Sequence, residues 1–256
     1  MFEQLAYDSS SQTQAGVEAI LQGSFMYKNN IGYIDTAGKY QTTNTLYSEQ
    51  IMTAAKNAKV SAYHIASKIL QEIGSKANSK YAGMGASGSV TGTYSKTYTG
   101  IYNFYNIGAT SSANPIANGL KWAKSGSTYQ RPWNTPEKSI LGGAQYLGEK
   151  YINAGQNTMY LQRFNVKSNG TYSIYTHQYM TNISGAASEA ASTADAYQSL
   201  GIAAHAKTFV IPVFNNMPNE SNTITLGISG NKKGVANSDV NVRKGPATSY
   251  DAVGVL

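Results

Sequence analysis

The stretch from Ser61 to Gly74 predicts one amphipathic helix, and it constrains the fold more than any other part of the chain. Ile65, Ile69 and Ile73 recur every four residues, which is the spacing of one helical face. Ser61 is a suitable N-cap residue, and Gly74 suits the left-handed conformation in which many helices end. We therefore expect the rest of the chain to be organised around this helix.

Glu72 is the chemically informative residue of this helix. It follows Ile65 by seven residues, about two turns, so it lies on the apolar face rather than toward water. It also lies in the last turn, where the helix dipole is negative. Burial and the dipole both disfavour the ionised carboxylate, and a general acid must hold its proton near neutral pH. This stretch alone leaves two readings: a general acid, or a carboxylate that only caps or salt-bridges at the end of a core helix.

Composition and charge limit the class of protein. The chain has 256 residues, enough for one large domain or for one domain with a small module. Only 13% of the residues are charged, about half the usual share, so uncharged polar residues, glycine and tyrosine must cover the surface. Lys and Arg (20) outnumber Asp and Glu (13), giving a formal net charge of +7. No basic cluster has the density of a nucleic-acid footprint, so we expect diffuse attraction to an anionic matrix and no nucleic-acid partner.

Several kinds of chemistry are excluded by missing residues. The absence of cysteine excludes disulfides and thiolate catalysis. The histidines, His64, His177 and His205, form no His-x-x-x-His pair, and the chain has neither a P-loop nor a Gly-x-Ser-x-Gly elbow. We therefore expect no metal and no cofactor. No apolar run reaches membrane-spanning length, and the N-terminal residues lack a signal-peptide pattern, which fits a cytoplasmic protein or one whose signal peptide has been removed.

Further elements are expected on both sides of the central helix. A second helix is predicted from Ser48, as its N-cap, to Ala58, and a third from Thr135 with Pro136 at its first position. Shorter segments are a strand around residues 33–35, helical turns around 17–21, 118–123 and 159–161, a final helix over 186–206 and an edge strand over 208–214. Residues 75–100 are rich in glycine and tyrosine and predict a loop or hairpin. The aromatic run 101–109 fits a buried strand or a loop beneath a groove.

Four stretches resemble the bacterial cell-wall N-acetylglucosaminidases of glycoside hydrolase family 73, the type found in Gram-positive autolysins. They are ASKILQEIG (66–74), YNFYNIGA (102–109), WNTPEKSILGG (133–143) and HQYMTNI (177–183). The resemblance implies an α+β, mainly helical, lysozyme-like catalytic domain with a small glycine- and tyrosine-rich β-lobe. This domain would cover residues 1–221, with an N-terminal helical region over 1–60. Residues 222–256 would be a linker and the start of a truncated SH3-like wall-binding module, whose first strands residues 239–256 resemble.

The resemblance also implies a function. A secreted, monomeric enzyme of the cell wall would hydrolyse the β-1,4 bond between N-acetylglucosamine and N-acetylmuramic acid in peptidoglycan glycan strands, its signal peptide being absent from this chain. Glu72 matches the family's acid, and Tyr179 matches a tyrosine near the scissile sugar. The expected substrate-binding residues are Tyr102, Asn103, Phe104, Tyr105, His177 and Gln178. Asn182 departs from the pattern, because relatives often have Asp there.

Two questions stay open at this point. The alternatives to a glucosaminidase are a muramidase or lytic transglycosylase on a similar fold, and a non-catalytic wall-binding protein. A second carboxylate is also missing, because residues 73–136 contain no Asp or Glu. A distant acid such as Asp35, Glu49 or Glu137 could fold in, polar groups could position a water, or the substrate's own 2-acetamido oxygen could attack. We favour the last route, because intramolecular attack is entropically favoured.

Overall fold

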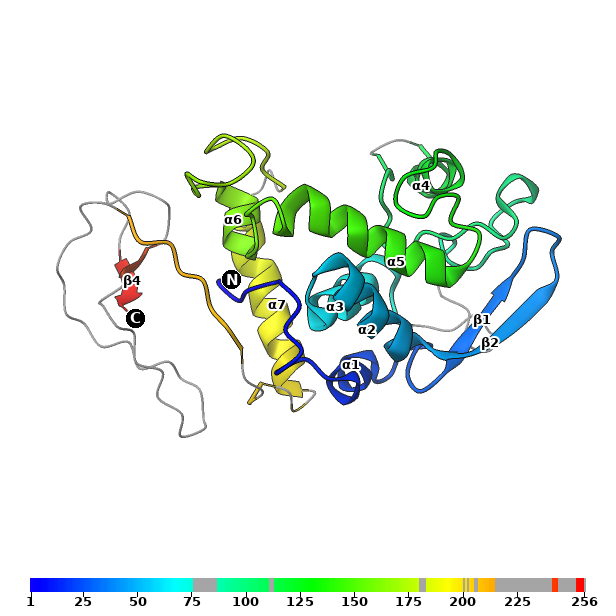
Figure 1. Cartoon of the computed structure of the whole chain (residues 1–256), viewed down its shortest axis with the longest axis horizontal. Coiled ribbons are helices and arrows are strands. Elements are labelled where there is room, and N and C mark those ends of the chain that lie inside the picture. The colour runs from blue at the N-terminus through cyan, green and yellow to red at the C-terminus, as the bar shows by residue number, and fades with distance from the viewer. Residues whose placement is uncertain are drawn as a thin grey trace.

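The structure is a computed structural model. It describes residues 1–75, 87–110, 113–179, 183–199, 201, 203–204, 207–214, 241–243 and 252–255. Within these ranges the chain is mainly helical (Figure 1). The helices are α1 (Gln14–Leu21), α2 (Tyr47–Ala58), α3 (Ala62–Ile73), α4 (Pro115–Lys124), α5 (Pro136–Leu147), α6 (Met159–Phe164) and α7 (Gly185–Ser199). The strands are β1 (Asn30–Ile34), β2 (Tyr40–Leu46), β3 (Asn241–Arg243) and β4 (Ala252–Val255), and short turns of 3-10 and π-helix cover Lys96–Tyr98 and Gly148–Ile152.

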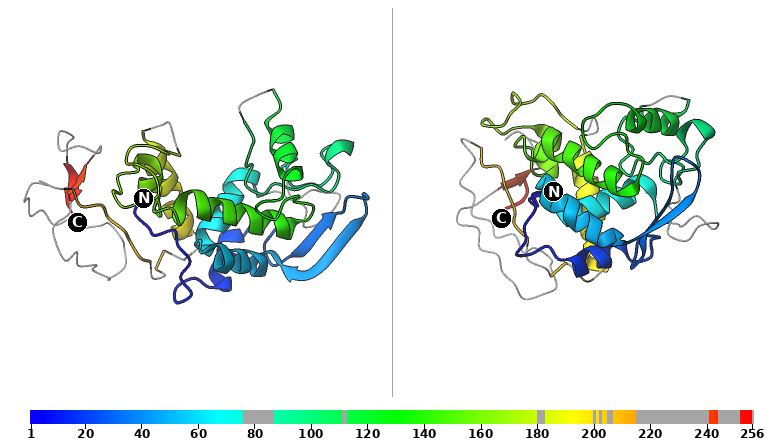
Figure 2. Two further views of the ribbon diagram at one scale, coloured as in Figure 1. Left: turned by 45° about the horizontal axis from the view of Figure 1, so that its top comes forward. Right: turned by 45° about the vertical axis from the view of Figure 1, so that its right-hand side comes forward.

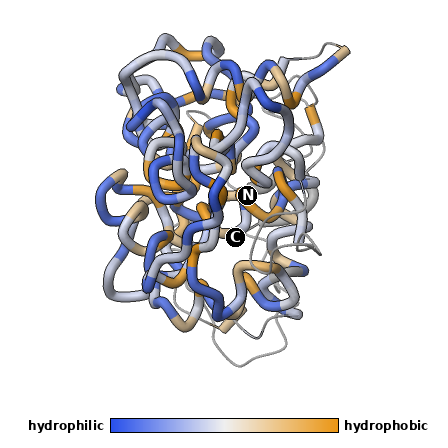
Figure 3. The backbone as a smooth tube through the Cα atoms, turned by 90° about the vertical axis from the view of Figure 1, so that its right-hand side faces the viewer, coloured by the Kyte–Doolittle hydropathy of each residue, from blue (hydrophilic) through white to orange (hydrophobic). Residues whose placement is uncertain are grey.

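The core is built around α3, as its apolar spacing predicts. Ile65 and Ile69 are fully buried, and they belong to one hydrophobic cluster with Val17 of α1, Ile51 of α2 and Ile140 of α5. Hydrophobic and hydrophilic stretches alternate at short intervals along the chain, as amphipathic helices require (Figure 3). α7 lies beside α6 and adds two buried residues to the same core (Figure 1).

Local signals fix the ends of the central helices. The Ser61 hydroxyl accepts a hydrogen bond from the His64 amide, and α3 ends at Gly74, whose φ is +76°. α5 begins as predicted, with the Thr135 hydroxyl accepting from the Lys138 amide. The prediction for α2 was wrong by two positions: Leu46 is its N-cap, and Ser48 lies inside the helix, fully buried.

The small sheet differs in position from the expected β-lobe. β1 and β2 pair antiparallel as a hairpin that extends away from the helices (Figures 1 and 2). The hairpin therefore comes from residues 30–46, not from the glycine- and tyrosine-rich region 75–100. Of that region the structure describes 75 and 87–100, which contain only bends, turns and the 3-10 turn. The sequence did not predict β2, because β2 is polar and lacks the apolar alternation of a strand. It is held in the hairpin by backbone hydrogen bonds to β1.

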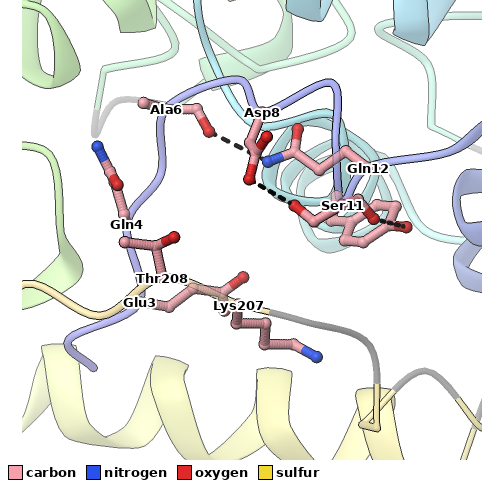
Figure 4. Close-up of a pocket in the computed structure, with 9 residues that line it drawn as sticks. Glu3, Gln4, Ala6, Asp8, Ser11, Gln12, Lys207 and Thr208 are labelled. Carbon is pink, nitrogen blue, oxygen red and sulfur yellow. Dashed lines mark hydrogen bonds between the residues drawn. The ribbon is translucent and has the colours of Figure 1, made fainter.

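The N-terminal segment packs along the start of α3. Ala6 forms a β-bridge with Val60, and Glu3 forms one with Phe209. The expected edge strand over 208–214 is therefore reduced to this single bridge. Around it, the N-terminal residues, Tyr63 and residues 207–208 line a pocket (Figure 4). This pocket lies at the opposite end of α3 from Glu72, so it is separate from the candidate site.

The remaining C-terminal expectations are only partly within the described ranges. α7 ends at Ser199, earlier than the expected helix over 186–206. β3 and β4 pair antiparallel. The rest of the expected linker and module, over 222–240, 244–251 and 256, lies outside the described residues. The division into domains at residue 221 therefore stays a prediction.

Candidate active site

Glu72 lies in the last turn of α3, and its side chain is 25% exposed. One turn earlier, the Lys68 ammonium lies 3.3 Å from Glu72 Oε1, and the lysine side chain is only 8% exposed. The carboxylate is thus partly open to solvent on one side and paired with a buried cation on the other. The sequence predicted an acid on the apolar face in the last turn of this helix, directed away from water. The structure places Glu72 in that turn but partly exposed, beside a cation that the prediction missed.

Asn106 holds Glu72 from a second direction. Its side-chain amide donates to the backbone oxygen of Glu72 at 2.7 Å and more weakly to Glu72 Oε2 at 3.4 Å. Carbonyl groups in the last turn of a helix have no partner within the helix, so the first bond also completes the end of α3. Asn106 has a φ of +51°, a conformation that asparagine tolerates better than most residues.

The four residues before Asn106 were expected to line a substrate groove, and the structure places them in the interior instead. Tyr102, Asn103, Phe104 and Tyr105 are each no more than 5% exposed. The Asn103 amide donates to the carbonyls of residues 107 and 119, and the Tyr105 hydroxyl donates to the carbonyl of residue 140. Their density of aromatic rings reflects burial, and their role in this structure is to fix the segment that presents Asn106.

The three predicted residues at 177–179 lie together on a surface loop. Tyr179 is 40% exposed as a residue. Its ring lies 5.1 Å from Lys68 Nζ, and its hydroxyl is hydrogen-bonded to the same lysine. His177 stacks on Tyr172 with ring centroids 3.7 Å apart. Gln178 is exposed and accepts a hydrogen bond from Arg163. Of the three, Tyr179 is the residue that contacts Lys68, the partner of Glu72.

His177 is held in position by its neighbours. Its Nδ1 lies 2.8 Å from Gln156 Oε1, and the Gln156 amide donates to the His177 backbone carbonyl at 2.9 Å. Burial, and then the positive charge of Lys150, lower the pKa of His177. The ring of Tyr151 contacts both His177 and Tyr179, with centroid distances of 4.7 Å and 5.5 Å. Together, the rings form an aromatic cluster beside the lysine, here called the aromatic wall: Tyr151, Tyr172, His177 and Tyr179.

A second carboxylate reaches the same lysine from α7. Glu189 Oε1 lies 3.7 Å from Lys68 Nζ, and the Glu189 side chain is 15% exposed. Burial lowers the pKa of Lys68, but Tyr179, Glu189 and Glu72 raise it by more, so it stays above its ordinary value and the lysine is charged. Spacing of four residues could have indicated the Lys68–Glu72 pair. No local signal connects Glu189 with it.

The three acids considered from the sequence have other surroundings. Asp35 accepts hydrogen bonds in the β1–β2 turn, and the bond from the Lys39 amide is the largest cause of its lowered pKa. Glu49 accepts from the Leu46 amide at the start of α2. Glu137 lies in the first turn of α5, and its Oε2 is buried without a hydrogen-bond partner among the described residues. Among the described carboxylates, Glu189 is the one that shares a partner with Glu72.

Comparison with known proteins adds evolutionary information. No family model matches the chain. The bifunctional autolysin of Staphylococcus epidermidis is 35% identical over 119 residues, which are 46% of this chain and 8% of that protein. The bifunctional autolysin of Staphylococcus aureus strain MSSA476 is 40% identical over 85 residues, which are 33% of this chain and 6% of that protein. The chain thus spans less than a tenth of the length of these relatives.

The fold has a counterpart among solved structures. The crystal structure of S. aureus autolysin E in complex with the muropeptide NAM-L-Ala-D-iGlu matches with a TM-score of 0.50 and 18% sequence identity, covering 83% of this chain and 77% of that chain. At this identity the likeness concerns the fold alone. The resemblance predicted from four short stretches is therefore confirmed: the chain is related in sequence to the bifunctional autolysins of staphylococci and has the mainly helical fold of an autolysin.

Proposed function

We propose that the chain is a peptidoglycan hydrolase that cleaves the β-1,4 bond between N-acetylglucosamine and N-acetylmuramic acid, with Glu72 as the general acid. The observation that carries this proposal is the placement of Glu72, which is partly exposed at the end of α3 and held by Lys68 and Asn106. Support also comes from the names of the related proteins and from the muropeptide bound to autolysin E, whose fold is similar.

In the proposed reaction, protonated Glu72 donates its proton to the glycosidic oxygen as the bond to the anomeric carbon breaks. The 2-acetamido oxygen of the same sugar attacks that carbon and forms a cyclic intermediate with a positive charge. Water then opens the ring, and the Glu72 carboxylate takes the proton that the water loses. In this proposal, Tyr179 steadies the developing charge. This route needs no second carboxylate to touch the sugar, and it retains the configuration at the anomeric carbon.

The proposed ligand is the glycan strand of peptidoglycan. We propose that sugar rings pack against the aromatic wall next to Lys68, where Tyr179 is the most exposed member and the most direct link to Glu72. His177 and Gln178 are proposed to contact the same ligand from the surface loop. The formal net charge of +7 would add attraction to anionic wall polymers. We further propose that the protein is secreted and works in the cell wall as a monomer. A linker and a wall-binding module would begin after residue 221. No helix among the described residues is both long and apolar enough to cross a bilayer.

Digestion of purified cell wall, followed by mass spectrometry of the fragments, tests the activity. A glucosaminidase leaves N-acetylglucosamine at the new reducing end, a muramidase leaves N-acetylmuramic acid, and a lytic transglycosylase leaves an anhydro sugar. Wall binding without loss of turbidity would mean a non-catalytic protein. Proton NMR of the first-formed anomer tests the route, since an initial α-anomer means inversion and excludes attack by the acetamido group.

The assignment of Glu72 is tested by Glu72→Gln. We expect the variant to keep the fold and wall binding but to lose activity by several orders of magnitude, because glutamine cannot donate the proton. Glu149→Gln is the matched control, since the Glu149 side chain is 60% exposed and pairs with the neighbouring Lys150. Activity of Glu72→Gln within tenfold of the unaltered chain would exclude Glu72 as the acid.

A further inference from the structure

Lys68 is a buried cation between two carboxylates that come from distant parts of the chain. Its Nζ lies 3.3 Å from Glu72 Oε1 on its own helix and 3.7 Å from Glu189 Oε1 on α7. The two distances together place these oxygens no more than about 7 Å apart, which is within the range of interacting charges even at a high effective dielectric constant. The charge states of Glu72 and Glu189 are therefore coupled through the lysine and directly.

The other groups around the Lys68 ammonium carry no negative charge that could balance it. On α3, His64 lies one turn before Lys68, and burial, and then the charge of Lys68, lower its pKa to about 3, so it is neutral under ordinary conditions. Also on α3, Gln71 Oε1 accepts from Lys68 Nζ at 3.4 Å. The surface loop contributes Tyr179, and the segment after residue 101 contributes the uncharged Asn106 at Glu72. Among the described groups named here, Glu72 and Glu189 are the negative charges that face Lys68.

Counting charges shows what the second carboxylate does. A general acid must hold a proton, and protonated Glu72 no longer balances the lysine. Leaving a buried ammonium without a counter-ion is strongly unfavourable. With Glu189 still ionised, protonation of Glu72 leaves a neutral Lys68–Glu189 pair beside a neutral acid. Without Glu189, the same protonation would leave Lys68 as an uncompensated buried charge.

We propose that Glu189 is a positioning residue for the acid: it keeps Lys68 paired so that Glu72 can hold the proton that it donates. The proposal rests on the function proposed above for Glu72 and adds a second, separate part to it. Glu189 acts through Lys68 and does not touch the substrate. In this scheme Lys68 fixes the position of Glu72, and the charge on α7 sets the pH up to which the acid remains protonated.

The pH profile of wall hydrolysis tests the proposal, because the two charges act in opposite directions. Activity needs protonated Glu72 and is lost as the pH rises. Glu189→Gln removes a negative charge and leaves Lys68 to hold Glu72 ionised, so the high-pH loss of activity should move down by about one pH unit. Lys68→Met leaves two carboxylates facing each other, so the loss should move up by about the same amount.

Matched variants separate the charge effect from a change in folding. Asp195→Asn removes the same charge from an exposed position on α7, and we expect its profile to be unaltered. Glu189→Asp keeps the charge and should restore most of the original profile. Glu189→Gln leaves Lys68 paired with Glu72 and should fold. The double variant Lys68→Met with Glu189→Gln removes both charges, and its pH profile should lie between those of the two single variants. It replaces Lys68→Met if that single variant unfolds.

Each remaining outcome is decisive. A Glu189→Gln profile that coincides with that of the unaltered chain overturns the proposal. The proposal is also overturned if Glu189→Gln loses activity at every pH and added azide restores that activity. Glu189 would then act directly on the sugar or on water. A chain that cleaves no wall preparation refutes the proposed function instead. In that case, carboxyl carbon NMR of Glu72 still tests the coupling, because its titration midpoint must be lower in Glu189→Gln than in the unaltered chain.

Discussion

Tyr102 provides the sharpest test of how the aromatic segment works. Its hydroxyl accepts a hydrogen bond from the Ile34 amide at 2.7 Å and donates one to the Ile34 carbonyl at 2.8 Å. Both bonds are buried, and they connect the end of β1 to the segment that carries Asn106. Tyr102→Phe removes one oxygen and leaves both backbone groups of Ile34 without this partner. The variant therefore tests a structural role against the substrate-binding role predicted from the sequence.

The expected magnitude follows from the groups left unpaired. An unsatisfied buried donor or acceptor costs about 1–3 kcal/mol, so losing partners for both groups of Ile34 should lower the free energy of unfolding by about 2–4 kcal/mol. Tyr105→Phe is the matched control. The Tyr105 hydroxyl donates to the carbonyl of Ile140 at 2.8 Å, and that carbonyl also belongs to the middle of α5. Its loss should cost only about 1 kcal/mol.

Urea unfolding followed by circular dichroism measures both values, and hydrolysis by the folded protein is measured in parallel. We expect Tyr102→Phe to be the less stable variant, with turnover and KM within about twofold of the unaltered chain. The reasoning is refuted if Tyr102→Phe is as stable as Tyr105→Phe, or if its KM rises severalfold while its stability is unchanged. The second result would return Tyr102 to the substrate site.

Three further predictions concern other parts of the molecule. Tyr179→Phe should lower turnover by about one to two orders of magnitude, because it removes a hydrogen bond to a charged group, and turnover within twofold would leave Tyr179 with a packing role. Gly142→Ala should lower the free energy of unfolding by at least about 2 kcal/mol, since a Cβ there would collide with the Tyr129 carbonyl and the Trp133 ring, and an unchanged urea midpoint would contradict this. Retention on purified wall should fall as salt rises, because exposed attractions are screened beyond roughly 8 Å at physiological ionic strength, and salt-insensitive retention would indicate specific recognition.

The parts of the fold that sequence could predict are those whose signals are local. α3 and α5 carry an N-cap hydroxyl and an apolar face within a few turns, and both begin as predicted. β2 has no such signal, because Tyr40–Leu46 is polar and mostly exposed and is held by backbone bonds to β1. The start of α2 was missed by two residues, because Ser48 is buried inside the helix, where the Gln14 side-chain amide donates to its hydroxyl.

In the candidate site, too, the sequence indicated residues with local signals and missed those that depend on long-range packing. Glu72 was singled out because its spacing of seven residues from Ile65 predicts a carboxylate on the apolar face of the helix, and its role as the acid stays a prediction. Tyr102 and Phe104 were misread, because aromatic density is the same in a groove wall and in a core, and only tertiary packing decides between them. Glu189 could not be found, because α7 carries weak apolar patterning and its contact with Lys68 joins two helices that are far apart in the sequence.

The late position of α7 in the chain has a consequence for the order in which the site is assembled. When the ribosome has released residues 1–179, Glu72, Lys68, Asn106 and Tyr179 have all been synthesised, but Glu189 has not. Nor has the chain yet supplied Ala186 and Tyr197, which α7 adds to the core. A nascent chain of that length, or a fragment cut just after residue 179, contains the acid without its full electrostatic setting. The site is completed only when α7 docks against α3 and brings Glu189 to Lys68.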